Sequence, residues 1–298
     1  MSINRETTSD RVFGICCYVF ATILMLIVLY PLWYIVICSV SDPYAVGAGK
    51  VWLWPVGFNV DGYARVFRDK NIMTGYGNTI FYTITGTLLN LTLTLTAAYA
   101  LSKKTLPGRG IIMAFVMFTM YFSGGLIPMY LQIKNMHLLN TRIVMIILGA
   151  VSVYNLIISR TFFLGLPKEL EEAAMIDGAG VTRTFIQIVL PLSKALIGVM
   201  VLYYGIGHWN SYFNAMIYIS DESKMPLQLF LRRILILENM SEDMSGGIGD
   251  DETKFEAEKL KMLLKYAVII VSSAPVLIIY PFLQKYFDKG VLLGSVKG

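Results

Sequence analysis

The residues that could carry out catalysis or hold a cofactor are few in this sequence, and they stand far apart. Only two histidines are present, His137 and His208, and no H-E-x-x-H pair that would bind zinc occurs. The dipeptide Gly49-Lys50 is followed by Val51 and lacks the leading glycine of a phosphate-binding loop. We therefore predict no catalytic residues, no metal site and no cofactor bound by this chain.

A different kind of chemistry, docking on another protein, is indicated by residues 166–191. Pro167 suits the start of a helix, because its missing N–H is not needed there. Residues with mostly small side chains then recur at the spacing of one helix face, which would let another surface approach closely. These are Leu170, Ala173, Ala174 and Asp177. Gly178 and Gly180 permit backbone angles that end a helix, and a second amphipathic helix precedes Pro191, which opens the next apolar segment.

The elements that position this loop are long apolar segments. The chain has 298 residues, 56% hydrophobic and 15% charged, whereas a soluble domain carries roughly 25% charge. Six stretches of 17 to 32 residues contain no Asp, Glu, Lys or Arg, and a helix needs about 20 apolar residues to cross a bilayer. The stretches are residues 13–40, 71–102, 111–133, 143–159, 195–220 and 266–284. We predict an all-α, polytopic membrane protein with six transmembrane helices.

The positive charges between these segments indicate the orientation. The short loop of residues 102–110 holds three Lys or Arg and no acid, and short loops with such an excess lie in the cytoplasm. By the count of spans, both termini and the loop of residues 166–191 fall on the same side. We therefore expect cytoplasmic N and C termini, and outward positions for the long loops of residues 41–77 and 221–265.

Polar and aromatic residues interrupt the fifth apolar segment. Such groups are costly in a bilayer unless they face protein or water. They would suit the lining of a translocation cavity, because hydrogen-bonding side chains and aromatic faces hold sugars. The alternative is that they pack between helices, each satisfied by a neighbour. The residues are His208, Trp209, Asn210, Tyr212 and Asn214.

The loop of residues 166–191 resembles the EAA motif of bacterial ABC importer permeases. The chain matches that motif at each fixed position. Glu172-Ala173-Ala174 is followed after three residues by Gly178, after nine more by Ile188, and after one more by Leu190-Pro191. The chain is similar over nearly its whole length to carbohydrate-type permeases related to the inner permease of the maltose transporter. Within these it resembles the lipoprotein-operon and polysaccharide-uptake branch of Gram-positive bacteria. Supporting stretches are residues 122–128, 208–214, 225–230 and 286–298.

The resemblance implies the type I ABC importer permease fold. The implied parts are residues 1–74 with the first transmembrane helix, a permease domain of residues 75–287, and a cytoplasmic tail of residues 288–298. In this family the EAA loop docks on the ATPase. Glu172 would contact the ATPase, Ala173 and Ala174 would form the close face, and Gly178 would make the turn.

The implied function is uptake of a sugar or oligosaccharide across the cell membrane. The implied partners are a second permease subunit in a heterodimer, two ATPase subunits that bind ATP and Mg²⁺, and an extracellular substrate-binding lipoprotein, with no nucleic acid. The outer loop of residues 221–265 would reach the binding protein, or else be a passive loop. An ion-coupled secondary carrier is the alternative function, but it would predict ionisable residues in mid-span, which the six segments lack.

Two glycines near the outer end of the third segment leave two structural hypotheses open. Gly124 and Gly125, followed by Pro128, predict either a kink that could act as a gate or close packing against another helix.

Overall fold

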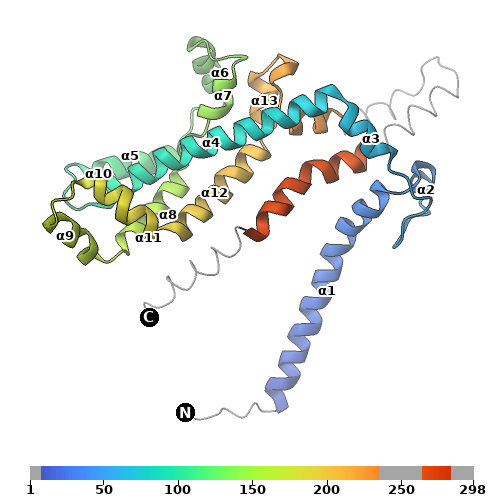
Figure 1. The fold of residues 1–298 in the computed structure, drawn as a ribbon, viewed down its shortest axis with the longest axis horizontal. Helices are drawn as coiled ribbons and strands as arrows, with labels where there is room; N and C mark the ends of the chain where they lie inside the picture. The colour runs from blue at the N-terminus through green and yellow to red at the C-terminus, as the bar shows by residue number, and fades with distance from the viewer. Residues whose placement is uncertain (1–7, 235–263, 283–298) are drawn as a thin grey trace. The chain divides into compact units, whose positions relative to one another are not determined.

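The computed structural model describes residues 8–234 and 264–282, and each element within these ranges is a helix (Figure 1). The chain divides into two units, which are described separately. Unit 1 comprises Met1–Asp69 and Ile234–Ser273, and unit 2 comprises Lys70–Arg233 and Ala274–Gly298. The predicted all-α class is confirmed. Most of the predicted outer loop of residues 221–265 and the tail of residues 288–298 lie outside the described residues.

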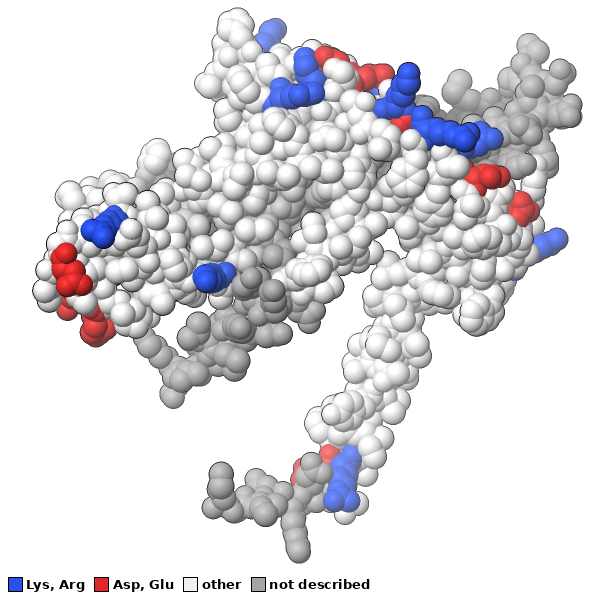
Figure 2. Space-filling view, in the orientation of Figure 1, with Lys and Arg blue, Asp and Glu red and all other residues white. Residues whose placement is uncertain are grey.

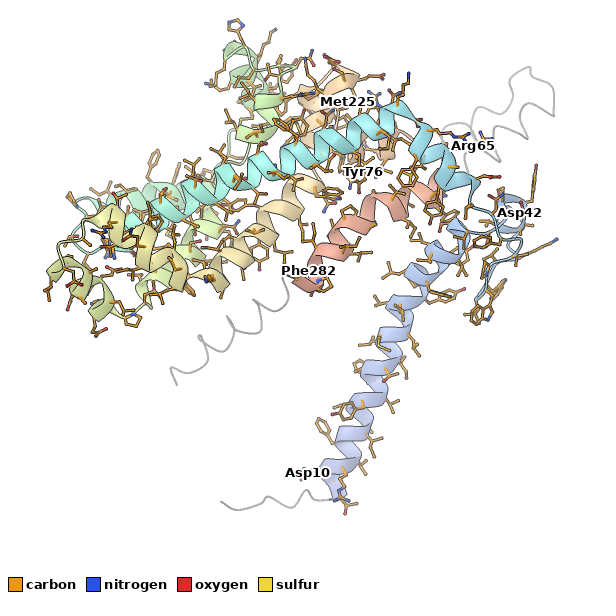
Figure 3. All side chains as sticks on the ribbon, viewed as in Figure 1. Asp10, Asp42, Arg65, Tyr76, Met225 and Phe282 are labelled. Atoms are coloured by element: carbon orange, nitrogen blue, oxygen red, sulfur yellow. The ribbon has the colours of Figure 1, made fainter. Side chains whose placement is uncertain are left out.

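Unit 1 is dominated by α1 (Thr8–Ser39), a helix of 32 residues. Its large apolar side chains are exposed along most of its length, with Phe13 at 72% and Tyr18 at 79%. Figure 3 shows these side chains projecting on all sides from the end at Asp10 onward. A helix that is apolar all round must be covered by lipid or by other protein, so α1 has the character of a transmembrane helix.

The segment after α1 folds back along the last turns of that helix. It contains α2 (Pro43–Gly47) and α3 (Asp61–Arg68). Trp33 Nε1 of α1 donates a hydrogen bond to the Leu53 carbonyl at 3.0 Å. Amphipathic Trp side chains favour the boundary between hydrocarbon and water, so this end of α1 has the composition of a membrane interface.

Unit 2 is built around α4 (Lys70–Ser102), a helix of 33 residues. Two shorter helices pack along it, α8 (Val153–Leu164) and α12 (Lys194–Trp209), as Figure 1 shows. Side chains of these three helices, together with residues 185–189, form the main apolar core. Its buried members are Leu95, Ala98, Tyr99, Leu101, Leu156, Phe163, Phe185, Val189, Leu196, Met200 and Tyr204.

Charged side chains over unit 2 gather at two ends of the helices. On the face shown in Figure 2, one group lies over α9 (Lys168–Ile176) and the start of α12. The other lies over α6 (Leu126–Asn135), α7 (Arg142–Ile147) and α13 (Phe213–Tyr218), with an uncharged band between the two groups. This is the distribution that a bilayer imposes on a protein that crosses it.

Three of the six predicted spans are continuous helices, namely α1, α4 and the helix Leu264–Phe282. The third span is broken. α5 (Arg109–Tyr121) and α6 meet at 114° across residues 122–125, where Gly125 has a φ of 86° that a residue with a side chain resists. The predicted span of residues 111–133 is therefore two helices and not one, and of the two hypotheses left open at the paired glycines the structure shows the kink.

The fourth and fifth predicted spans are interrupted as well. α7 ends at Ile147 and α8 begins at Val153, while α12 ends at Trp209 and α13 begins at Phe213. Within the described residues, three helices are long and apolar enough to cross a membrane, or up to five if each bent pair is one span. The predicted count of six is not confirmed, because charge-free runs report apolar segments and not unbroken helices.

The break between α7 and α8 is stabilised by side chains from α4 and α12. Asn90 Nδ2 donates to the carbonyls of Gly149 and Ala150, at 2.9 and 2.8 Å. The Tyr204 hydroxyl accepts from the Ser152 N–H at 3.2 Å. A broken helix leaves backbone groups without partners, and hydrocarbon offers none. These two polar residues therefore make the interruption of the fourth span possible.

A second set of α4 side chains holds the segment that follows α13. Asn78 Nδ2 donates to the carbonyls of Ser223 and Met225, at 2.8 and 3.0 Å. The Tyr82 hydroxyl donates to the Lys224 carbonyl at 2.7 Å, and the segment includes a 3₁₀ turn, η2 (Glu222–Lys224). Since these donors lie on one rigid helix, the loop after α13 is fixed to α4.

Gly86 on α4 lies directly against the His208 ring of α12, so a substitution there tests how these two helices pack. A Cβ added at Gly86 would lie 2.4 Å from the ring of His208 on α12. Gly86→Ala should therefore separate the helices and lower stability by about 1–3 kcal/mol, as overpacking of a core does. Thermal unfolding of the detergent-solubilised protein would measure the change.

Gly77→Ala is the matched control, because Gly77 lies on the same helix and an added Cβ would meet nothing within 4 Å. It should leave the unfolding midpoint unchanged or raise it slightly, since Ala favours helix over Gly by roughly 0.5–1 kcal/mol. Equal midpoints for the two variants would contradict the close approach of α4 and α12.

Candidate functional site

The predicted docking loop folds as a helix, a sharp turn and a second helix. α9 (Lys168–Ile176) follows Pro167, which occupies the capping position one residue before the helix. The Gly178 N–H donates to the Met175 carbonyl at 3.0 Å, and the Ala179 N–H donates to the Ala174 carbonyl at 2.9 Å. This pair of bonds is the Schellman motif, which requires a left-handed residue directly after the helix.

Gly178 supplies that left-handed residue, with a φ of 77°. The prediction that Gly178 makes the turn is confirmed. Gly180 was expected to contribute in the same way, but its φ is −71° and it caps the next helix with extended backbone. The turn therefore depends on one glycine, because the Schellman motif needs only one residue with positive φ.

The second half of the loop leads into α12 through a bend. α10 (Val181–Thr184) continues as a π-helical turn, η1 (Phe185–Val189), and then as α11 (Leu190–Leu192). This stretch meets α12 at 82° across Ser193. Pro191 was predicted to open the fifth span, but it lies before the bend, in α11. Ile188 and Leu190 of the motif are half-buried.

Aromatic packing anchors this second half in the core of unit 2. Phe185 stacks on Tyr99 of α4 with ring centroids 4.7 Å apart, and both rings contact Phe163 of α8. Phe185 and Val189 are buried, at 9% and 1% exposed. Stacked and edge-to-face aromatic pairs add stability beyond the area they bury. A displacement of the loop must therefore act on the helices of the core.

The motif residues on α9 face in different directions. Glu172, Ala173 and Asp177 are exposed, whereas Ala174 is buried at 5%. The predicted close face of Ala173 and Ala174 is thus divided, because Ala174 points toward its own chain. Sequence spacing places residues on one face of a helix, but it does not fix how that helix is rotated against its neighbours.

Exposed apolar residues surround the turn, and the sequence interpretation missed them. Ile176 is 87% exposed, Val181 70% and Met175 59%. We call these three residues with Glu172 and Asp177 the docking tip. Exposed apolar side chains that lie together beside acidic groups are typical of a protein–protein interface.

One ion pair connects this loop to the loop between α4 and α5. Lys103 Nζ pairs with a carboxylate oxygen of Glu171, and both side chains are largely buried, at 27% and 17% exposed. The same ammonium group lies 4.1 Å from the ring centroid of Tyr99, within the range of a cation–π contact. The two loops are therefore held on the same side of unit 2.

The five residues predicted as cavity lining do not form one site. His208 Nε2 lies 2.7 Å from Asn90 Oδ1. The Asn90 NH₂ group already donates to two carbonyls, which fixes the orientation of the amide. The atom that faces His208 is therefore the acceptor oxygen, and His208 Nε2 donates. Trp209 is buried at 6% and packs edge-on against Tyr76. For these two residues the structure shows contacts between helices.

The remaining three residues lie where α12 has ended. Asn210 and Tyr212 are exposed in the break before α13, and Asn214 is half-buried in α13. The five residues, which were predicted inside the fifth span, are therefore divided between the end of α12, the break after it and α13. Asn210 Oδ1 accepts from Gln228 Nε2 at 3.5 Å, so these three residues belong to the surface at the end of α12.

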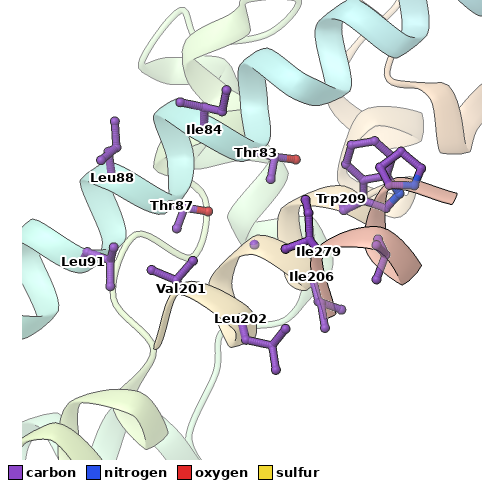
Figure 4. Close-up of a pocket in the computed structure, with 13 residues that line it drawn as sticks. Thr83, Ile84, Thr87, Leu88, Leu91, Val201, Leu202, Ile206, Trp209 and Ile279 are labelled. Atoms are coloured by element: carbon purple, nitrogen blue, oxygen red, sulfur yellow. The ribbon is translucent and has the colours of Figure 1, made fainter. Parts of the chain in front are cut away.

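A pocket of about 300 Å³ lies beside α4 and α12, next to residues 275–279 (Figure 4). Trp209 is the only one of the five predicted residues in its lining. The hydroxyls of Thr83 and Thr87, both on α4, are buried there and have no hydrogen-bond partner among the residues that the structure describes. The rest of the lining is apolar, so the pocket suits apolar side chains or lipid better than a sugar.

Comparison with known proteins agrees with this arrangement. The family described as the binding-protein-dependent transport system inner membrane component matches residues 91–293. Protein LplC of Bacillus subtilis (strain 168) is 40% identical over 99% of this chain and 98% of its own length. The polygalacturonan/rhamnogalacturonan transport system permease protein YtcP of the same organism is 38% identical over 97% of this chain and 99% of its own.

A solved structure is similar over the same range. The crystal structure of a bacterial ABC transporter involved in the import of the acidic polysaccharide alginate contains a chain with 35% sequence identity and a TM-score of 0.84. The match covers 94% of the present chain and 98% of that chain. At this identity and coverage the two chains share their fold.

The helices of both units and the projecting loop define a multi-pass membrane transport subunit of the type I ABC importer permease fold. The chain belongs to the family of binding-protein-dependent transport system inner membrane components. It is the permease of an ABC importer in the plasma membrane, and it is not itself an enzyme. Permeases of this family work with another permease, an ATPase and a substrate-binding protein.

The left-handed turn at Gly178 yields a test of the docking loop. Gly178→Ala adds a Cβ at a φ of 77°, which costs roughly 1–2 kcal/mol and is relieved by re-aiming α9 against α10. We expect normal membrane insertion but reduced co-purification of the ATPase with the tagged permease.

Gly180→Ala serves as the control two residues away. Its φ is −71° and an added Cβ would meet nothing within 4 Å, so ATPase co-purification should match the wild type. If both substitutions reduced it equally, the turn geometry would not be the cause.

Proposed function

We propose that this chain is the permease subunit of an importer that takes up a sugar or oligosaccharide, and that the docking tip fits into its ATPase. The observation that carries the proposal is an apolar, acid-flanked turn that projects from unit 2 and is rooted in its core. Ile176, Val181 and Met175 are exposed around one turn, at 87%, 70% and 59%, and a group of exposed apolar side chains marks an interaction site. Phe185 and Glu171 join the same loop to α4 and to the loop that follows it.

The ATPase is the partner proposed for this tip because ATP-driven transport requires a mechanical connection between subunits. A shift of α9 is transmitted through the bend at Ser193 to α12, and through Phe185 to Tyr99 on α4. These two helices pack along each other. Glu172 is exposed beside the apolar residues, where a cation of the ATPase would pair with it. ATP and Mg²⁺ would be bound by the ATPase subunits.

We propose that the docking loop and both termini lie in the cytoplasm. The Lys103–Glu171 pair holds the two loops on one side of unit 2. The loop of residues 102–110 carries three positive charges and no acid, which favours the cytoplasmic side. The loop after α13 would then face outward, toward the binding protein.

The proposals for the substrate class and for the particular partners are based on the proteins to which this chain is similar. YtcP is named for transport of polygalacturonan and rhamnogalacturonan, and MdxG of Bacillus subtilis, 24% identical over 99% of this chain, for transport of maltodextrin. We propose a heterodimer with a second permease subunit, two ATPase subunits, and an extracellular substrate-binding lipoprotein. An ion-coupled carrier is not favoured, because uptake by this family depends on a binding protein.

The docking role predicts a specific loss at Glu172. Glu172→Ala should insert normally and keep its thermal stability, since the side chain is exposed in the isolated subunit. Against the ATPase it would strand a buried cation, at a cost of about 2–5 kcal/mol. ATPase co-purification and ATP-dependent uptake into proteoliposomes, with an ionophore present, would measure the loss.

Lys168→Ala is the control on the same helix, because Lys168 is exposed at the start of α9, away from the turn. It should retain association and uptake. Wild-type association by Glu172→Ala would refute the docking role of this carboxylate.

The proposed orientation can be tested with cysteines added at exposed positions. In a variant whose Cys16, Cys17 and Cys38 are replaced, an impermeant thiol reagent applied to intact cells should label Ser220→Cys and leave Thr105→Cys unlabelled. Both positions are exposed, so accessibility differs only by the side of the membrane. The reverse labelling pattern would overturn the orientation.

A further inference from the structure

The exposed residues at the end of α12 lie beside a cation that the sequence interpretation did not consider. We propose that Arg232 and Tyr212, with the amides of Asn210 and Gln228, form a binding site for the carboxylate of an acidic sugar. The site would receive a uronate residue of an oligosaccharide at the outer mouth of the permease. This inference rests on the proposed function and specifies its substrate class.

Arg232 and Tyr212 come together from different parts of unit 2. The Arg232 guanidinium carbon lies 5.2 Å from the ring centroid of Tyr212, and its Nη1 contacts the sulfur of Met216. Arg232 is partly buried, whereas Tyr212 is 41% exposed. The aromatic ring and the thioether hold the guanidinium without using its hydrogen-bonding capacity for an acid.

The neighbouring cations have acidic partners, but Arg232 has none among the residues that the structure describes. Arg233 pairs with Glu222 at 2.8 Å, and Lys224 pairs with Asp221 at 3.0 Å. Hydrogen bonds from Ser223 and from Lys224 hold the pKa of the Asp221 carboxyl at about 2. Asp221 therefore stays ionised, and paired with Lys224, at any physiological pH. A guanidinium that is partly removed from water, with no acid beside it in the described part of the chain, favours a carboxylate ligand, which it can bind with two parallel hydrogen bonds.

The two amides suit the hydroxyl groups of the same ligand. Gln228 and Arg232 are four residues apart in the helical residues 227–234, so they lie on one face. Gln228 Nε2 donates to Asn210 Oδ1, which leaves the Asn210 NH₂ and the Gln228 carbonyl oxygen for a ligand. A donor, an acceptor, an exposed aromatic ring and a cation match the groups of a uronate better than those of a neutral sugar or a small inorganic anion.

The test uses the complete transporter in proteoliposomes, with permease pair, ATPases and binding protein. The ligands are an oligogalacturonate and its methyl ester, which differ in the carboxylate charge, each at a concentration that saturates the binding protein. Arg232→Gln should reduce uptake of the acid roughly tenfold or more, the effect of one charge-assisted hydrogen bond. Uptake of the ester and thermal stability should be unchanged, and Arg232→Lys should restore part of the acid uptake.

Arg233→Gln is the charge-matched control, because Arg233 is the adjacent residue and already pairs with Glu222. It should leave uptake of the acid near the wild-type level. The inference is overturned if Arg232→Gln and Arg233→Gln transport the acid equally well, or if Arg232→Gln loses acid and ester alike. Absence of ATP-dependent uptake of any saccharide by the wild type would instead refute the proposed function.

Discussion

The structure depends on one constraint, which is that a backbone group freed by a broken helix needs a partner where no water is present. Three of the predicted spans are interrupted, and each interruption exposes N–H and C=O groups. At the break between α7 and α8 the partners are side chains. Asn90 donates twice to the carbonyls there, Tyr204 accepts from Ser152, and His208 donates to Asn90. The polar residues of α4 and α12 are therefore structural, since they allow short helices to exist within the apolar part of the fold.

The same side chains determine how closely α4 and α12 approach. Gly86 leaves room for the ring of His208, and that ring completes the hydrogen bonds of Asn90. These contacts hold α4 and α12 in one arrangement over their middle sections. The aromatic contact between Phe185 and Tyr99 connects α4 in the same way to the docking loop. A subunit that must transmit motion needs such rigid connections, because a loosely packed core would absorb a displacement instead of passing it on.

The sequence predicted those features that depend on local composition or on a motif. Charge-free runs placed α1 and α4 closely, and the spacing of the motif placed the turn at Gly178. Features that depend on distant contacts were not predictable. Asn90 and its carbonyl partners are about 60 residues apart in the chain, and nothing local marks that pairing. The inward position of Ala174 depends on the rotation of α9. That Arg232 has no acid partner among the described residues depends on which acids its neighbours pair with.

The docking tip also bears on how unassembled copies of the subunit are degraded in the cell. If the tip docks on the ATPase in the cytoplasm as proposed, a permease made in excess of its ATPase leaves Ile176, Val181 and Met175 exposed there. Chaperones and proteases recognise apolar side chains of this kind, because an exposed apolar patch is also the mark of an unfolded chain. An orphan copy is thus distinguishable from an assembled one although both are folded. Under the proposed docking, the tip would therefore balance subunit numbers, since permeases left without an ATPase would be the ones open to degradation.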